Sequence, residues 1–311
     1  MSAGDMASLG VAPHTMATVN ASATAPTLAP LPARFARLVK IEHTVFALPF
    51  AYVGAFLAVG KTPSAHDLLW ITLAMIGARS LAMALNRLID AGIDARNPRT
   101  AGREIPSGQL SVVQVVLFCA GSLALFLVAV WQLAPLTHWL WPIPVAGFVL
   151  YPYLKRFTWL CHLWLGAVDG LAPVGAWVAI TNHLPWEAWL LGAAVALWVA
   201  GFDFFYALFD VDVDRAQGLH SIVTRFGVRG AFAGARLAHL ATVACLVAAG
   251  LGLSVGALYW IGVAVVAALL LYEHSLVRPG DLHRLDAAFF TMNGVISVAF
   301  AVFVIADAIV G

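Results

Sequence analysis

The chain has 311 residues, of which 62% are hydrophobic and 11% are charged. Soluble domains average about 45–50% apolar and about 25% charged residues, so a soluble globule could not cover this much apolar side chain. With 17 Lys and Arg against 16 Asp and Glu, the balance excludes a basic nucleic-acid binder. The mean hydropathy of +0.89 excludes a disordered protein. We therefore expect an all-α integral membrane protein with the lipid bilayer as its main solvent.

Residues 1–33 are rich in Ala, Thr and Pro and show no periodicity. They predict a disordered N-terminal tail, followed by a single transmembrane domain over residues 34–311. A membrane-spanning helix needs about 20 mainly apolar residues. About nine such segments follow, at approximately 38–60, 67–88, 111–131, 138–154, 160–182, 187–209, 231–252, 255–273 and 285–309. Several prolines make the boundary between the third and fourth segments hard to place, so a total of eight spans is the alternative.

The positive charges fall on one side of this layout. If there are nine spans, 15 of the 17 Lys and Arg residues lie at or before the start of the first span, or in and beside the even-to-odd loops. Of the other two, Lys61 lies on the opposite side and Arg79 lies inside the second span. Because cytoplasmic loops carry the excess of Lys and Arg, we expect the N-terminus and the charged loops to be cytoplasmic. The C-terminus is then expected outside.

Carboxylates gather at the ends of two spans. Asn86, Asp90 and Asp94 recur every four residues at the end of the second span. The end of the sixth span repeats the pattern with Asp203, Tyr206, Asp210 and Asp214. Spacings of three and four residues keep such side chains on one face of a helix. Both faces are predicted at the cytoplasmic mouth of the bundle.

Facing carboxylates repel one another, so a cation is expected between them. Hard oxygen ligands with room for water and phosphate suit Mg²⁺, which normally completes its coordination shell with substrate phosphates. Two acidic faces across a cavity predict a site for a diphosphate bridged by metal ions. The alternative is that these residues are solvated helix ends paired with neighbouring arginines.

The two motifs closely resemble the signature motifs of the UbiA family of intramembrane aromatic prenyltransferases. Three further stretches support the resemblance: Arg99-Thr-Ala-Gly-Arg103-Glu-Ile-Pro106-Ser-Gly108, Tyr151-Pro-Tyr-Leu-Lys155-Arg156-Phe-Thr158 and Gly218-Leu-His-Ser221-Ile. It covers roughly residues 35–309 and points to the quinone-biosynthesis branch, which includes the 4-hydroxybenzoate polyprenyltransferases.

The resemblance implies a bundle of about nine transmembrane helices around a central cavity, and an enzyme that transfers a polyprenyl group from an allylic diphosphate to a hydroxylated aromatic acid. It implies two Mg²⁺ ions, held with the diphosphate by Asn86, Asp90, Asp94, Asp203, Asp210 and Asp214. Of these residues, four together with Tyr206 are the expected catalytic residues: Asp90, Asp94, Asp210 and Asp214. The remaining phosphate oxygens are expected to bind Lys155, Arg156, Arg99 and Arg103. The alternative is that these positive charges only set the orientation of the protein in the membrane.

The chemistry expected of such a site is electrostatic. Metal and cations withdraw charge from the diphosphate, the allylic C–O bond ionises, and an electron-rich ring attacks the allyl cation before losing a proton. Water must be excluded, or it would quench the cation. Aromatic side chains could shield the cation, although such residues in membrane helices are usually packing residues. The candidates are Phe202, Phe204, Phe205, Tyr206 and Trp164.

Two ionisable residues lie deeper in the predicted bundle than the motifs. Arg79 precedes Asn86 by two helical turns, and Asp169 lies in the middle of the fifth span. Charges at that depth are functional candidates. We expect Arg79 to bind the carboxylate or phenolate of the acceptor, with a structural Arg79–Asp169 pair as the alternative.

The start of the first span bears on the acceptor. Many 4-hydroxybenzoate transferases of the family have an Arg-x-Asp-Lys-Pro-like stretch there, whereas this chain has Lys40-Ile-Glu42-His43-Thr44. Lys40 and His43 are candidate acceptor-binding residues. The expected acceptor is 4-hydroxybenzoate, for ubiquinone or menaquinone synthesis, and another aromatic acid of a menaquinone pathway is the alternative.

A function of another class, ion-coupled secondary transport, also uses intramembrane acids. Transport sites lie near the midplane, whereas these acids gather at one mouth of the bundle. The sequence also shows no inverted repeat. It does not predict an oligomeric state.

Overall fold

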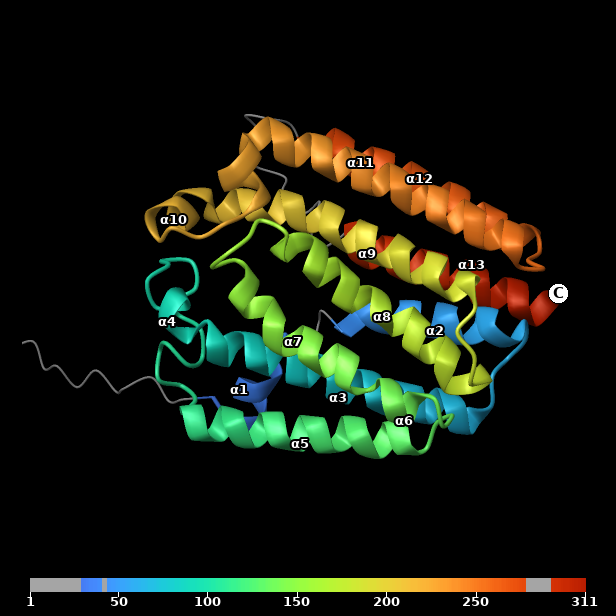
Figure 1. Ribbon diagram of the computed structural model, residues 1–311, viewed down its shortest axis with the longest axis horizontal. Helices are drawn as coiled ribbons and strands as arrows, with labels where there is room; N and C mark the ends of the chain where they lie inside the picture. The colour runs from blue at the N-terminus through green and yellow to red at the C-terminus, as the bar shows by residue number, and fades with distance from the viewer. Residues whose placement is uncertain (1–28, 41–43, 278–291) are drawn as a thin grey trace, which may run out of the picture.

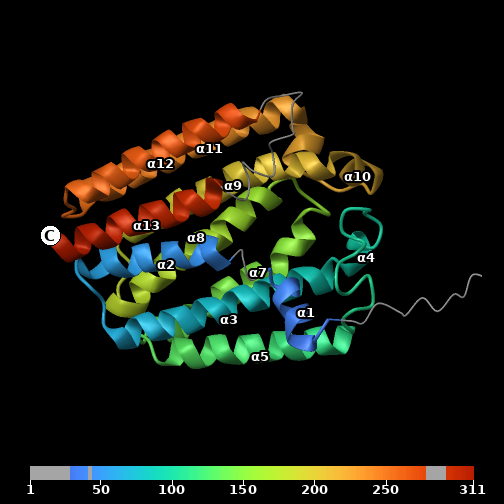
Figure 2. The ribbon, with the colours of Figure 1, turned by 180° about the vertical axis from the view of Figure 1, so that it is seen from behind.

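The computed structural model describes residues 29–40, 44–277 and 292–311, and these form helices and connecting loops without a strand. The long helices lie side by side along one direction, with α4 (Ala91–Asp94) and α10 (Val211–Ala216) at one end of the bundle and the C-terminus at the other (Figures 1 and 2). Residues 1–28 of the predicted tail lie outside the described residues. Helix α1 (Leu31–Leu38) begins just before the predicted domain boundary at residue 34.

Each of the nine predicted spans has a counterpart among the described helices. They are α2 (Thr44–Val59), α3 (Ala65–Ile89), α5 (Val112–Trp131), α7 (Pro142–Leu154), α8 (Cys161–Thr181), α9 (Trp186–Tyr206), α11 (Ile222–Gly252), α12 (Ala257–Leu276) and α13 (Asn293–Val310). Seven helices of the described chain are long and apolar enough to cross a membrane by themselves, and α2 contains a shorter apolar stretch. The protein is therefore an integral membrane protein of the all-α class, as predicted.

Three boundaries differ from the prediction for local reasons. Lys40 has a positive φ of 47°, which separates α1 from α2 and shortens the first predicted span. A short helix α6 (Thr137–Leu140) precedes α7, which begins at Pro142, where proline is well tolerated. Helix α11 begins nine residues earlier than predicted, at the N-cap Ser221, and crosses a break at Gly227, whose φ is 71°.

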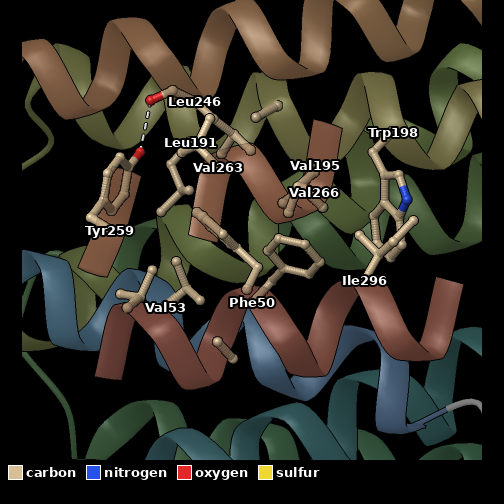
Figure 3. Packing of buried hydrophobic residues seen from close by; sticks show 14 of the residues in the cluster. Phe50, Val53, Leu191, Val195, Trp198, Leu246, Tyr259, Val263, Val266 and Ile296 are labelled. Carbon is tan, nitrogen blue, oxygen red and sulfur yellow. Dashed lines mark hydrogen bonds between the residues drawn. The ribbon is translucent and has the colours of Figure 1, made fainter. Parts of the chain in front are cut away.

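A buried apolar cluster joins α2, α9, α11, α12 and α13. The ring of Phe50 in α2 packs in a tilted arrangement against the ring of Trp198 in α9, with centroids 5.0 Å apart (Figure 3). Tyr259 of α12 is fully buried, and its hydroxyl donates a hydrogen bond to the carbonyl of Leu246 at 2.7 Å. Because little water is available in the bilayer core, this bond satisfies a hydroxyl that would otherwise be costly to bury.

Helices α8 and α9 approach each other closely through small residues. A Cβ added to Gly166 of α8 would lie 2.0 Å from the carbonyl oxygen of Ala196, and one added to Gly170 would lie 2.4 Å from that of Gly192. Glycines four residues apart permit this close backbone contact between membrane helices. The contact fixes the position of α9, which carries the second acidic motif, relative to α8.

Candidate functional site

A cavity of about 520 Å³ runs inside the bundle and is lined by residues of α2, α3, α5, α7, α8 and α9. One end is lined by the charged residues of both motifs, whereas apolar residues such as Val130 and Leu133 line much of the remainder. The polar end lies near α4 and α10, at the end of the bundle away from the C-terminus (Figure 1). The two motifs, more than 100 residues apart in sequence, thus share one cavity.

The first motif lies at the C-terminal end of α3. That helix ends at Ile89, Asp90 is its C-cap, and the short helix α4 then carries the chain to Asp94. The predicted single helical face is therefore broken at Asp90. Asn86, Asp90 and Asp94 nevertheless all line the cavity. Asp90 is 3% exposed and Asp94 is 4% exposed, so these acids are buried and do not belong to a solvated helix end.

The second motif extends over a change of helix type. Helix α9 ends at Tyr206, the 3₁₀ helix η2 (Ala207–Asp210) follows, and α10 begins at Val211. The change alters the helical spacing after Tyr206, but all four motif residues line the cavity: Asp203, Tyr206, Asp210 and Asp214.

The four cations that we assigned to the diphosphate contact these carboxylates. Lys155 Nζ lies 3.0 Å from Asp90 Oδ2, and Arg156 Nη2 lies 3.3 Å from Asp90 Oδ1. Arg103 Nη1 donates to both carboxylate oxygens of Asp94 at 2.7 Å. The pairing expected in the alternative interpretation is thus present, but the two acids in it, Asp90 and Asp94, are buried.

Arg99 joins the loop after the first motif to the second motif. Its Nε donates to Asp210 Oδ1 at 2.9 Å, its Nη2 contacts Oδ2, and its Nη1 donates to the Tyr206 hydroxyl at 2.8 Å. Asn97 Nδ2 donates to the same Oδ1 at 2.9 Å. Burial alone would lower the pKa of Arg99, but its bonds to Asp210 and the nearby Tyr206 raise that pKa above its ordinary value. Arg99 therefore stays positively charged at any physiological pH.

The donor set of this site suits Mg²⁺ bound together with a phosphate. The motif side chains offer hard oxygen atoms, and Asp214 makes no hydrogen bond or ion pair through its carboxylate within the described part of the chain. No three His, Cys, Asp or Glu side chains of the described residues converge closely enough to hold a metal ion by themselves. The residues therefore fit Mg²⁺ when phosphate oxygens and water supply the remaining ligands.

Arg79 and Asp169 face each other across the cavity wall. Arg79 Nη1 lies 3.6 Å from Asp169 Oδ1, and both residues line the cavity. The structural pair, which was the alternative interpretation of Arg79, is thus present at the surface of the cavity. Lys40 also lines the cavity, whereas His43 lies outside the described residues.

The aromatic candidates divide into two groups. Phe202 and Tyr206 line the cavity. Phe204 and Phe205 are instead buried in a separate apolar cluster, and Trp164 donates through Nε1 to the carbonyl of Gly147 at 3.2 Å. None of these three residues lines the cavity, so the alternative role as packing residues suits them better. For Phe204 and Phe205 the reason is that consecutive positions on α9 point in different directions.

Two side chains of the site escaped the sequence interpretation. His162 of α8 lines the cavity, and its Nδ1 lies 2.6 Å from Asp203 Oδ2. Asn97, which holds Asp210, also lines it. A signal for His162 was present: His162, Gly166 and Gly170 recur every four residues, which places the histidine on the face of α8 that contacts α9.

Comparison with known proteins decides the family. The model of the UbiA prenyltransferase family matches residues 47–295. The chain belongs to the UbiA prenyltransferase family. Among its UbiA-family relatives is the 4-hydroxybenzoate octaprenyltransferase of Vibrio vulnificus, 33% identical over 241 residues that cover 76% of this chain and 83% of the relative. The enzyme of the same name from Cupriavidus necator is 30% identical over 278 residues, 88% of this chain and 97% of the relative.

Solved UbiA structures share the fold. A UbiA homologue from Aeropyrum pernix K1 superposes with a TM-score of 0.78 at 33% identity, over 86% of this chain and 98% of the homologue. A UbiA homologue from Archaeoglobus fulgidus, solved with GPP and Mg²⁺ bound, gives 0.68 at 18% identity over 88% and 99%. At that lower identity the likeness concerns the fold. The predicted family and the all-α membrane fold are confirmed, and this chain is a prenyltransferase-family enzyme.

Proposed function

We propose that this enzyme transfers a polyprenyl group from an allylic polyprenyl diphosphate to the ring of a hydroxylated aromatic acid, 4-hydroxybenzoate, in quinone biosynthesis. One observation carries the proposal: two acidic motifs and three cavity-lining cations, Lys155, Arg99 and Arg103, meet at the polar end of an otherwise largely apolar cavity. The relatives named 4-hydroxybenzoate octaprenyltransferase support the choice of substrates.

The polar end of the cavity would bind the diphosphate. Two Mg²⁺ ions would be held by the motif residues Asn86, Asp90, Asp94, Asp203, Asp210 and Asp214, and by the phosphate oxygens. When bound, the metal neutralises the diphosphate and makes it a better leaving group. Lys155 and Arg103 now contact Asp90 and Asp94. These two side chains and Arg99 would donate to the phosphate oxygens that do not bind the metal, with Arg156 beside them.

The rest of the cavity would protect the reaction from water. The allylic C–O bond breaks, the ring carbon of the acceptor forms the new C–C bond, and the ring then loses a proton, giving prenylated acid, inorganic diphosphate and H⁺. Phe202 and Tyr206 line the cavity, so their rings can lie beside the developing allyl cation and stabilise it. The apolar walls exclude the water that would quench it.

The acceptor would bind deeper in the cavity than the diphosphate. Arg79 can pair with the acceptor carboxylate or phenolate, while Asp169 orients the guanidinium across the 3.6 Å that separates them. Lys40 would add a second positive charge, and His43 is a candidate donor to the phenolic oxygen. The stretch Lys40-Ile-Glu42-His43 favours keeping a menaquinone-pathway aromatic acid as a second candidate acceptor.

We also propose that the N-terminus and the site loops face the cytoplasm. Arg34 of α1 donates to the carbonyl of Gln109 at 2.7 Å, which ties α1 to the loop that follows the first motif. These two cation-bearing segments thereby share one end of the bundle, and the positive-inside rule would assign that end to the cytoplasm. Reporter fusions at residue 108 and at the C-terminus should show cytoplasmic and external locations, respectively.

The decisive experiment measures product formation by the purified enzyme with Mg²⁺, geranyl diphosphate and a panel of aromatic acids. Prenylated 4-hydroxybenzoate that disappears on addition of EDTA is the expected result. Product from a naphthoate-type acid alone would assign the enzyme to a menaquinone pathway with the same mechanism. Folded enzyme that consumes no geranyl diphosphate with any acid would contradict the proposal.

A further inference from the structure

His162 is buried at the start of α8 and faces the second acidic motif on α9. It is 7% exposed, and its Nδ1 lies 2.6 Å from Asp203 Oδ2. The imidazole also packs edge-on against the ring of Phe204, with centroids 5.6 Å apart. Backbone contacts at Gly166 and Gly170 press α8 against α9, so the histidine and the aspartate lie on two closely packed helices.

The hydrogen bond has a defined direction. An ionised carboxylate only accepts, so Nδ1 of His162 is the donor and Oδ2 of Asp203 is the acceptor. Within the described part of the chain, this is the contact that the Asp203 carboxylate makes, which leaves Oδ1 without a partner. Because Asp203 lines the cavity, Oδ1 is available to a ligand there.

The partner of Asp203 differs from those of the other paired acids. Asp90, Asp94 and Asp210 each contact cationic side chains through both carboxylate oxygens, and those cations come from flexible Lys and Arg chains. An imidazole has only two side-chain torsions and is held here between two helices. It can therefore hold a carboxylate in one orientation.

We propose that His162 is a positioning residue that fixes Asp203 Oδ2 and thereby presents Oδ1 to the Mg²⁺–diphosphate ligand. The proposal rests on the function proposed above. Hydrogen bonds that orient a metal-binding carboxylate typically change metal affinity by about 10- to 100-fold when they are removed. Loss of the His162 donor should therefore weaken Mg²⁺-dependent ligand binding without removing any direct ligand.

The test uses the full-length enzyme in detergent and calorimetric binding of geranyl thiolodiphosphate, an unreactive analogue, over a series of Mg²⁺ concentrations. His162→Leu removes the donor, and His162→Asn places an amide nitrogen where Nδ1 lies. His162→Gln keeps an amide but moves it to the position of Nε2. We expect about 10- to 100-fold weaker Mg²⁺-dependent binding for the Leu and Gln variants, and recovery to near the wild-type value for Asn.

His239→Asn is the matched control, because His239 is also buried against α9 but does not line the cavity. It should bind the analogue as the wild type does. Wild-type affinity in the Leu and Gln variants would overturn the positioning role, and so would an equal loss in the Asn or His239 variants. If the Leu variant does not fold, the comparison of Gln with Asn decides. A wild-type enzyme that does not bind the analogue would instead overturn the proposed function, and this inference with it.

Discussion

Arg99 and Asp210 join the two acidic motifs directly: Arg99 Nε donates to Asp210 Oδ1 at 2.9 Å, across 111 positions of sequence. Arg99 also lies over the ring of Tyr206, with its guanidinium carbon 5.2 Å from the ring centroid. The loop that follows α4 is thereby held against the 3₁₀ turn that ends α9. Under the proposed function, a diphosphate bound between the motifs would contact the same side chains that hold the loop and the helix together.

Asp210 and Asp212 offer a comparison of two neighbouring acids. Asp210 lines the cavity, whereas Asp212 is exposed and does not. We expect Asp210→Ala to abolish measurable prenyl transfer because it removes a carboxylate from the diphosphate site, and Asp90→Ala to do the same. Asp212→Ala should retain wild-type kcat and KM in the same assay. Normal turnover of folded Asp210→Ala enzyme would overturn the site assignment.

Metal and diphosphate should bind together rather than one after the other. The described part of the chain has no preassembled group of three metal-ligating side chains, so we expect phosphate oxygens and water to complete the coordination of Mg²⁺. Calorimetry should thus detect weak binding of Mg²⁺ alone and of geranyl thiolodiphosphate alone, but much tighter binding when both are present. Tight binding of Mg²⁺ to the protein without any phosphate would contradict this expectation.

Arg79→Lys separates acceptor binding from diphosphate binding. Lysine keeps the charge but loses the planar group that can contact a carboxylate through two nitrogens. Loss of one charge-assisted hydrogen bond corresponds to about a tenfold or larger effect, so KM for the aromatic acid should rise at least about tenfold. KM for the prenyl diphosphate, which binds nearer the motifs, serves as the internal control. An unchanged KM for the acid would leave Arg79 as a purely structural partner of Asp169.

Gly166 and Gly175 test the close packing of α8. A Cβ at Gly166 would lie 2.0 Å from the carbonyl oxygen of Ala196, whereas one at Gly175 meets no atom within 4 Å. Gly166→Ala should lower the free energy of unfolding by about 1–3 kcal/mol, as expected for an overpacked contact. Gly175→Ala should leave it nearly unchanged. Thermal unfolding in detergent compares the two variants, and equal melting temperatures would show that α9 moves aside without cost.

The sequence was sufficient to predict the motif residues and most of the helices. Regular spacing identifies Asp90 and Asp94 as members of one group, and both line the cavity. It could not predict that the α-helical geometry ends at Asp90 and tightens to 3₁₀ after Tyr206, because both changes depend on tertiary packing. The contact of His162 with Asp203 requires the relative position of two helices, which the sequence indicates only through the glycines of α8.

The close contact of α8 with α9 at Gly166 and Gly170 also restricts how these two helices can move relative to each other. Helices whose backbones touch cannot slide or separate without losing contacts over the whole seam. Any change in the width of the cavity during a catalytic cycle must therefore come from elsewhere. The loop between α4 and α5 contains Arg99 and Arg103, whose hydrogen bonds to Asp210 and Asp94 could be replaced by bonds to phosphate. Gly108, near the end of this loop, has a φ of 74°, a backbone conformation that strongly favours glycine. Under the proposed function, the helix pair that carries Asp203 stays in place while Arg99 and Arg103 exchange carboxylate partners for phosphate.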